Sequence, residues 1–207
     1  MGPDGPHIFE SADVTGTRVR VRALRAADAE AWDEFVLATP SATFFHRVGW
    51  QSVIERAFGH RTHYLLAESA DAIVGVLPLT EVKSRLFGHS LVSNVFCVYG
   101  GIATSNDEAR TALDQAAQQL ARDLRVGHLE YRQLTSSHAD WPNQDLYFTF
   151  RKAIDPDLEA NMLAIPRKQR AMVRKGIKNG LVSELDPTVD RFFKLFADNV
   201  KRHGTPA

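Results

Sequence analysis

The sequence has a single cysteine, Cys97, no long hydrophobic run and no excess of charge of either sign. One cysteine cannot form an intramolecular disulfide or a cysteine-based zinc site, which argues against a disulfide-stapled secreted module. The longest apolar run, residues 73–79, is far shorter than the ~20 residues of a membrane-spanning helix. The 25 basic and 25 acidic residues balance, so the surface as a whole is not built for nucleic acid or anionic membranes.

Several motifs of known chemistry are also missing. The N-terminal residues lack the basic and apolar regions of a signal peptide, and we therefore expect a cytoplasmic protein. The standard glycine-rich phosphate loops and the Gly-x-Ser-x-Gly turn of serine hydrolases are absent. Only His60 and His63 lie close together among the histidines, with no acidic ligand beside them, so we expect no metal site. Cys97 lies between apolar residues and is expected to be buried.

Hydrophobic patterns predict the element order β-α-α-β-β-β-α-β-β through residue 150. Strands are expected at residues 17–24, 62–67, 73–79, 91–99, 128–134 and 146–150, and helices at residues 28–37, 48–58 and 106–125. Residues 62–67 and 73–79 should form a hairpin, Gly59 should end a helix, and Asn106 should cap one. The arginines of the first strand are expected to face water. This order indicates an α/β fold with a mixed, largely antiparallel sheet.

The last part of the chain has a different character. We expect helices at residues 156–164, 166–178 and 189–200, with a strand at residues 181–185. Six cations and no acid lie between Ala164 and Gly180, which leaves 19 basic and 25 acidic residues elsewhere. In a helix, Arg167, Arg170, Arg174 and Lys178 share one face, where they repel one another. An anionic partner would relieve this repulsion, and guanidinium groups suit phosphate.

Four segments together resemble the FemAB-like aminoacyl/acyltransferases of the GNAT superfamily. They are Thr43-Phe-Phe-His-Arg-Val-Gly-Trp50, Val76-Leu-Pro-Leu79, Val98-Tyr-Gly-Gly101 and Pro166-Arg-Lys-Gln-Arg-Ala-Met-Val-Arg-Lys-Gly176. The basic segment is the most specific of them. The resemblance is closest to the FemAB-related branch associated with bacterial exosortase/PEP-CTERM exopolysaccharide systems.

The resemblance implies two GNAT-like (acyl-CoA N-acyltransferase) domains in tandem, each a mixed sheet flanked by helices. On this basis we expect a mobile arm at residues 1–16, a first domain at 17–153, a basic helical connector at 154–180 and the truncated start of a second domain at 181–207. This chain would then be the N-terminal part of a longer bacterial enzyme. Because the family's donor-side groups lie mostly in the second domain, no catalytic residue is assigned.

The family transfers an aminoacyl or acyl group to an amine of a cell-envelope precursor, and a Lys-x-Arg pattern helps to hold the precursor's phosphates. Here that pattern is Lys168-Gln169-Arg170, which makes these two cations the first candidates for anion binding. The further candidates in the basic segment are Arg167, Arg174, Lys175 and Lys178. Candidates for a substrate pocket are Trp50, Tyr99, Gly100 and Gly101. The expected donor is aminoacyl-tRNA or acyl-CoA, and the expected acceptor is an anionic envelope or polysaccharide-linked amine.

Two other functions remain open from the sequence. The basic helix could bind RNA, such as a tRNA acceptor arm, although no aromatic residue lies between its cations for base stacking. The chain could instead be a self-contained small-molecule N-acetyltransferase. Residues 56–59 share Arg-x-x-Gly with the pyrophosphate loop of acetyltransferases. That loop follows a strand and begins a helix, whereas Gly59 is expected to end a helix.

Overall fold

The computed structural model describes residues 9–11, 19–86, 88–144 and 148–205. The chain divides into two compact units, Met1–Asn143 and Gln144–Ala207. The first unit thus ends before residue 153, where the sequence placed the boundary. Most of the expected arm, residues 1–8 and 12–16, lies outside the described residues, but Phe9–Ser11 within it form a strand.

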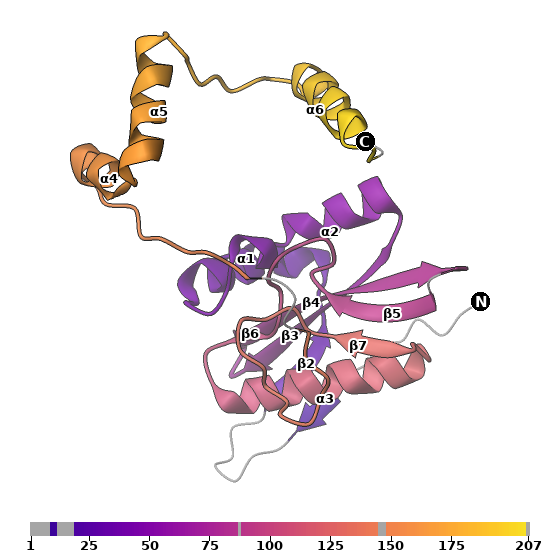
Figure 1. Ribbon diagram of the computed structural model, residues 1–207. Coiled ribbons are helices and arrows are strands. Elements are labelled where there is room, and N and C mark those ends of the chain that lie inside the picture. The colour runs from indigo at the N-terminus through magenta and orange to yellow at the C-terminus, as the bar shows by residue number, and fades with distance from the viewer. Residues whose placement is uncertain (1–8, 12–18, 87, 145–147, 206–207) are drawn as a thin grey trace. The chain divides into compact units, whose positions relative to one another are not determined.

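Within the described residues, seven strands form one sheet in the first unit (Figure 1). They are β1 (Phe9–Ser11), β2 (Val19–Ala23), β3 (Arg61–Ser69), β4 (Ala72–Ser84), β5 (Gly88–Ser93), β6 (Ala103–Thr104) and β7 (His128–Glu130). The order across the sheet is β1-β2-β3-β4-β5-β7, and β6 pairs with β4. Neighbouring strands are antiparallel except β5 and β7, which are parallel. The mixed, largely antiparallel sheet expected from the sequence is therefore confirmed.

Strands β3 and β4 form the predicted hairpin, with Ser69 opposite Ala72. The two loop residues, Ala70 and Asp71, both have positive φ angles, of 49° and 63°. This is the backbone conformation of a type I′ turn, whose twist matches that of the flanking strands. Strand β4 runs on to Ser84, well beyond the predicted end at residue 79, because it pairs with β5 on its other side. Pro78 lies inside β4, opposite Tyr64 of β3.

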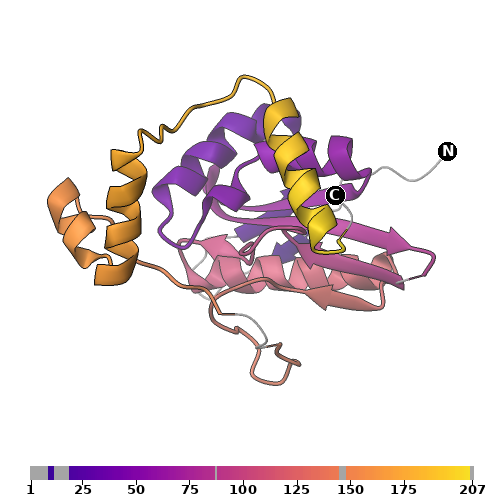
Figure 2. The same cartoon turned by 45° about the horizontal axis from the view of Figure 1, so that its top comes forward.

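Helices cover both faces of this sheet (Figures 1 and 2). Helix α1 (Ala29–Ala38) follows a 3-10 turn, η1 (Ala26–Asp28), and buries Trp32 and Val36 against one face. The second 3-10 turn, η2 (Phe44–His46), precedes α2 (Gly49–Val53), which continues into the π-helix η3 (Ile54–Phe58). Gly59 ends η3 with a φ of 68°, as predicted.

Helix α3 (Asp107–Asp123) packs on the opposite face of the sheet. Its small and apolar side chains at three- and four-residue steps, including Ala109, Leu113 and Ala116, meet Leu77 and Leu79 of β4 in the largest core cluster. The Asn106 side chain accepts a hydrogen bond from the Ala109 amide at 2.8 Å, which confirms the predicted cap.

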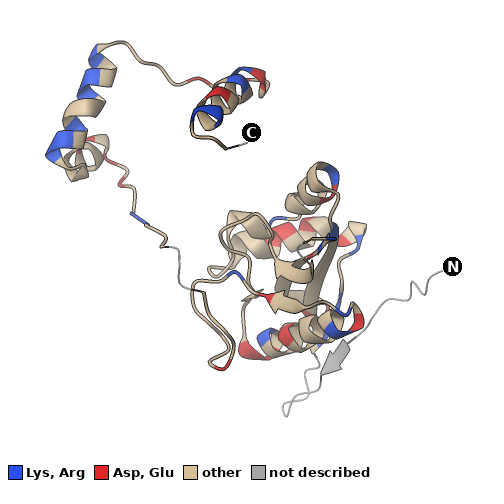
Figure 3. Ribbon diagram, turned by 45° about the vertical axis from the view of Figure 1, so that its right-hand side comes forward, with Lys and Arg blue, Asp and Glu red and all other residues tan. Residues whose placement is uncertain are grey.

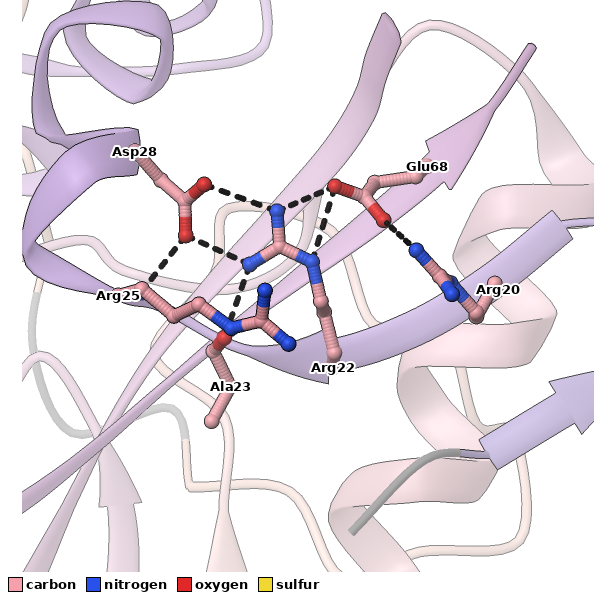
Figure 4. Close-up of polar contacts among 6 residues, drawn as sticks. All are labelled: Arg20, Arg22, Ala23, Arg25, Asp28 and Glu68. Atoms are coloured by element: carbon pink, nitrogen blue, oxygen red, sulfur yellow. Dashed lines mark hydrogen bonds and ion pairs between the residues drawn. The ribbon is translucent and has the colours of Figure 1, made fainter. Parts of the chain in front are cut away.

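Arg22 of β2 corrects the expectation that the arginines of this strand face water. It is only 7% exposed, and its guanidinium binds the Asp28 carboxylate through two bonds of 2.6 and 2.9 Å (Figure 4). The same guanidinium also pairs with Glu68 of β3, whose other oxygen accepts from Arg20 at 3.0 Å. These contacts fix the start of α1 to β2 and β3. The alternating pattern missed them because the partners of Arg22 come from other elements, Asp28 from η1 and Glu68 from β3.

The second unit contains three helices within the described residues, α4 (Leu158–Ala164), α5 (Arg167–Lys178) and α6 (Asp190–Arg202). Helix α5 ends as predicted at Asn179-Gly180. The Leu181 amide donates to the Gly176 carbonyl, and Gly180, with a φ of 71°, donates to Ile177. This pattern is a Schellman motif, in which glycine readily takes the left-handed position.

Two strand predictions in this part of the chain are wrong. Residues 181–185 form no strand, because no neighbouring strand pairs with them. Residues 148–150 have no regular structure either, and residues 145–147 lie outside the described part. No helix among the described residues is long and apolar enough to cross a membrane.

Candidate functional site

The candidate site lies where β5 and β7 end. Open sheets tend to bind ligands at the carboxyl ends of strands, at the point where the strand connections change direction. Here β5 is antiparallel to β4 but parallel to β7, and the β5–β7 pairing covers only Ser90–Val92 and His128–Glu130. We call the residues just beyond this pairing, 93–94, 99–101 and 131–133, the β5–β7 junction.

The junction is formed because β5 ends earlier than predicted. The sequence predicted a strand over residues 91–99, but the ladder stops at Ser93. Asn94 and Phe96 then have positive φ angles, of 45° and 64°, and the chain turns away from β4. The amides of Gly100 and Gly101 both donate to the Arg132 carbonyl, at 2.7 and 3.0 Å. The glycine segment therefore lies beside the continuation of β7, in the place that β5 has left.

Asn94 is the buried centre of this turn. Its amide nitrogen Nδ2 donates to the Phe45 carbonyl at 2.7 Å and to the Tyr99 carbonyl at 3.4 Å. Its oxygen Oδ1 is buried and has no partner among the described residues. A Cβ atom at position 100 would lie 2.6 Å from Asn94 Cγ, so only glycine fits there.

His46 ties a second part of the chain to the junction. Its Nδ1 accepts a hydrogen bond from the Thr43 amide at 3.0 Å, so the ring hydrogen lies on Nε2. Nε2 then donates to the Gly101 carbonyl at 2.9 Å. The ring is buried, and burial lowers its pKa. No role for His46 was predicted from the sequence, although it lies within the Thr43–Trp50 segment on which the resemblance rests.

Trp50 reaches the same region through aromatic contacts. Its ring lies 5.6 Å from that of Phe45, whose carbonyl binds Asn94, and 5.8 Å from that of Phe44. The Trp50 Nε1 atom is buried with no partner among the described residues. The four pocket candidates, Trp50 and residues 99–101, are thus linked through Phe45 and Asn94. The glycine amides, however, are already occupied by Arg132.

Cys97 is buried, as expected, and burial raises the pKa of its thiol. A protonated, covered thiol is a poor nucleophile. Arg132 packs beside it, with Nη1 on the Cys97 carbonyl at 3.2 Å and Nε on the Glu130 carboxylate at 2.7 Å. We therefore assign Cys97 to the core of the turn. Among the described residues no group of three His, Cys, Asp or Glu side chains could hold a metal ion.

The turn that leads from β6 into α3 is a second position at which a pyrophosphate loop could lie. It has the strand-then-helix order that a pyrophosphate loop needs. Yet Asn106 already satisfies the Ala109 amide, and the first turn of the helix carries Asp107 and Glu108. Two carboxylates at this helix start repel an anionic ligand. The structure therefore offers no cationic or glycine-rich cradle for pyrophosphate at this position.

The anion-binding candidates belong to α5 in the second unit. Arg167, Arg174 and Lys178 are exposed on one face of this helix, and Lys168 and Lys175 are exposed beside them. Figure 3 shows basic residues spaced along α5. Within the part of the chain that the structure describes, none of these five cations pairs with an acid.

Arg170 differs from the other cations of α5. It is half-buried, and its Nη2 donates to the carbonyl oxygens of Leu163 and Ile165 at 2.9 and 3.0 Å, with Nε on Ile165 at 3.2 Å. These carbonyls lie at the carboxyl end of α4, where helix carbonyls lack partners. Arg170 therefore holds the corner between α4 and α5.

No protein-family model matches the chain, and no curated protein matches it. Among solved structures, the chain is similar to a transcriptional regulator from Bacillus halodurans C-125, at 12% identity and a TM-score of 0.43, over 63% of this chain and 99% of that one. It is also similar to a ribosomal-protein-alanine N-acetyltransferase from Brucella melitensis biovar Abortus 2308, at 16% identity and a TM-score of 0.39, over 63% and 99%. An aminoglycoside 6'-N-acetyltransferase from Acinetobacter haemolyticus is similar at 15% identity and a TM-score of 0.40, over 65% and 99%.

Proposed function

We propose that the chain is part of a FemAB-like N-acyltransferase that acts in the cytoplasm on an amine of a phosphate-bearing cell-envelope or exopolysaccharide-related acceptor. The observation that carries this proposal is that two segments of the resemblance meet at the β5–β7 junction. Thr43–Trp50 and Val98–Gly101 are far apart in sequence, yet His46 binds Gly101 and Phe45 binds Asn94 at the carboxyl ends of the parallel strands.

The reaction is attack of the acceptor amine on an activated acyl carbonyl. The amide C–N bond forms, the ester or thioester bond to the donor breaks, tRNA or coenzyme A leaves, and the amine loses a proton. Two side chains near the junction are unsuited to chemical roles. Cys97 is a buried thiol with a raised pKa, so we expect direct transfer without a cysteine-bound acyl group. Both ring nitrogens of His46 are engaged, by Thr43 and Gly101, so it is not a free general base. The described residues contribute acceptor binding in this proposal.

The proposal is tested by acceptor binding, the role that it gives to the described residues. An amino-sugar oligosaccharide and its phosphorylated counterpart are each titrated into the purified chain, and we expect the phosphorylated form to bind at least about fivefold more tightly, since charge-assisted hydrogen bonds to phosphate are strong. Equal binding of the two forms by a folded chain would contradict the proposal.

In this proposal the exposed cations of α5 bind the phosphates of the acceptor. Pyrophosphate serves as a probe, measured by calorimetry. Replacing Arg174 and Lys178 together by glutamine should weaken its binding at least about fivefold, since each cation offers a charge-assisted hydrogen bond. The double variant Lys194→Gln with Lys201→Gln on α6 is the charge-matched control and should leave the affinity unchanged. Equal affinities in both variants would remove α5 from the site.

A second candidate function is RNA binding by the same helix, which the five unpaired cations of α5 favour. Contacts to about four phosphates of a single strand would give a slope of roughly −3 in a plot of log affinity against log salt. No aromatic side chain lies on α5 to stack bases. A salt slope near zero for a tRNA acceptor-arm oligonucleotide would exclude this function, and a steep slope without binding of the phosphorylated oligosaccharide would favour it.

A self-contained small-molecule N-acetyltransferase is the third candidate. It requires a site for coenzyme A within this chain. This function would be favoured over the other two if the isolated chain binds acetyl-CoA tightly and if free coenzyme A competes for the same site.

A further inference from the structure

A pocket of about 350 Å³ that is open to solvent, called the cavity below, lies on the α3 side of the sheet, outside the β5–β7 junction. It is formed by the second half of α3, by β7 and by the segment that follows β7. The lining residues are Gln118, Ala121, Arg122, Leu129, Trp141 and Pro142. Its volume is at the lower end of the range for small-molecule sites, which suits a ligand of about a dozen non-hydrogen atoms.

One wall of this cavity is held in place by neighbouring side chains. The Trp141 ring stacks on His138, with 3.9 Å between the ring centroids and 8° between the planes, and Tyr131 lies 5.6 Å from Trp141. The carboxylate of Asp114 binds both supporting groups, with Oδ1 accepting from Tyr131 Oη at 2.9 Å and from His138 Nε2 at 3.0 Å. Trp141 is therefore positioned before any ligand arrives, which lowers the entropy cost of binding.

The same carboxylate orients a polar group of the lining. Asp114 Oδ2 accepts from Gln118 Nε2 at 2.8 Å, which fixes the amide one turn further along α3. A single side chain of α3 thus holds the aromatic wall and one part of the polar lining. Leu129, Ala121 and Pro142 supply the remaining apolar surface.

Arg122 gives the cavity a cation. Its Nε and Nη2 are bound to Gln119 Oε1, at 3.2 and 2.8 Å, and this contact limits the freedom of the guanidinium. Its third nitrogen, Nη1, has no hydrogen-bond partner within the described part of the chain. Arg122 lies in the last turn of α3, where its charge offsets the negative end of the helix dipole. A carboxylate would find a charged donor here.

We propose that this cavity binds a small aromatic carboxylate. The aromatic ring would stack against Trp141 over the apolar lining, and the carboxylate would accept from Arg122 Nη1. A neutral aromatic amide fits the same space but lacks the charge that Arg122 selects. A cationic aromatic molecule is repelled by the guanidinium. This site does not depend on the acyl-transfer proposal, because none of its lining residues belongs to the β5–β7 junction.

The test uses the indole N–H signals of the three tryptophans in proton–nitrogen NMR spectra. Benzoate is titrated into the full chain, and Trp141→Phe assigns the relevant signal. We expect benzoate to shift the Trp141 signal with saturation, while the signals of Trp32, which is bound to the His46 carbonyl, and of Trp50, whose Nε1 is buried, remain in place. Benzamide, the neutral counterpart of benzoate, should bind at least about fivefold more weakly.

Two variants distinguish specific recognition of the carboxylate from nonspecific binding. Arg122→Gln should abolish the preference for benzoate over benzamide, whereas Arg125→Gln, two residues beyond the end of α3 and outside the lining, should retain it. The proposal is overturned if Trp141 does not respond to benzoate, if benzamide binds equally well, or if Arg122→Gln leaves the preference intact. The dispersion of the NMR spectrum shows in each case that the variant is folded.

Discussion

The Nε2 atom of His46 lies 2.9 Å from the carbonyl oxygen of Gly101, and this bond joins η2 to the β5–β7 junction across 55 residues of sequence. The imidazole ring is buried, and its other nitrogen is committed to the amide of Thr43. The neutral ring with its hydrogen on Nε2 is therefore the form that both contacts require.

Replacement of His46 by its two amide analogues should separate these contacts. In His46→Gln the amide nitrogen can still donate to Gly101, whereas in His46→Asn the side-chain oxygen can only replace the contact to Thr43. An unsatisfied buried acceptor costs about 1–3 kcal/mol, and we expect His46→Asn to show this loss. Hydrogen exchange of the Gly100 and Gly101 amides should be faster in His46→Asn than in His46→Gln. Equal exchange rates in the two variants would contradict a role for His46 at the glycine segment.

Burial of His46 should also make the fold sensitive to mild acid. Its pKa in the folded protein lies below the ordinary value of about 6.5, so below that pH the unfolded chain binds a proton that the folded chain does not. Stability should be complete above pH 6.5 and should fall as the pH drops toward the lowered pKa. Urea unfolding at several pH values measures this effect. His63, whose pKa burial also lowers, acts in the same range, so the difference between wild type and His46→Gln isolates His46.

Gly100 is expected to tolerate no side chain. In Gly100→Ala the new methyl group would overlap Asn94, so we expect a loss of about 2 kcal/mol or more and a displaced turn. Gly49→Ala is a matched control, because a Cβ at that helical position meets nothing within 4 Å. It should leave stability unchanged or raise it by up to about 1 kcal/mol. Denaturant midpoints of the two variants would decide the matter, and similar midpoints would argue against the packing described for Asn94.

The buried guanidinium of Arg22 should contribute strongly to stability. Arg22→Ala leaves the carboxylates of Asp28 and Glu68 without their common partner, and we expect a loss of about 3 kcal/mol. Arg20→Ala removes a more exposed single contact to Glu68 and should cost less than about 1 kcal/mol. Chemical unfolding of both variants tests the contrast, which would be refuted by equal losses.

The same pair of carboxylates predicts a second loss of stability at lower pH. Hydrogen bonds from Arg22 lower the pKa of both Asp28 and Glu68. Their contribution is therefore present above the ordinary carboxyl pKa of about 4 and is lost as the pH falls below it. The slope of stability against pH between about 4 and 2 should be smaller in Arg22→Ala than in wild type. An unchanged slope would mean that these carboxylates are not paired in solution.

Arg170 and Arg174 should respond differently to substitution, although both lie on the basic face of α5. Arg170→Gln should reduce the helical circular dichroism, because Arg170 binds the carbonyl oxygens of Leu163 and Ile165 at the end of α4. Arg174→Gln should keep the helical signal and weaken only the binding of pyrophosphate. If Arg170→Gln weakens pyrophosphate binding with no change in helicity, its role is anion binding instead.

Much of the fold could be predicted because local signals and tertiary structure agree. Asn106 and the apolar steps of residues 109–124 identify α3, and Gly59 and Gly180 end their helices as glycine often does. The failures occur where long-range packing overrides the pattern. Residues 94–99 are apolar enough for a strand, but Asn94 and Phe96 turn the chain. Arg22 occupies a polar position of an alternating pattern, which is typical of a surface residue. It is nevertheless buried, because its partners come from other elements.

The candidate site was only partly accessible from the sequence. Trp50 and the segment 99–101 could be selected by resemblance, and the structure links them through Asn94. His46 gave only the weak signal of an imidazole within an aromatic segment, since its partner lies 55 residues away. Arg170 is half-buried, unlike the other cations of the basic segment. This could not be predicted, because charge spacing does not show which guanidinium will cap the preceding helix.

Pro78 explains why the junction forms where it does. In the antiparallel ladder Pro78 would exchange two hydrogen bonds with Asn94, but proline has no N–H to donate. Only the bond from the Asn94 amide to the Pro78 carbonyl forms, at 3.1 Å, and the Asn94 carbonyl accepts instead from Cys97 at 3.0 Å. The missing N–H of Pro78 in β4 thus sets the length of β5. The position of the glycine segment beside β7 is therefore encoded in β4, the strand next to β5.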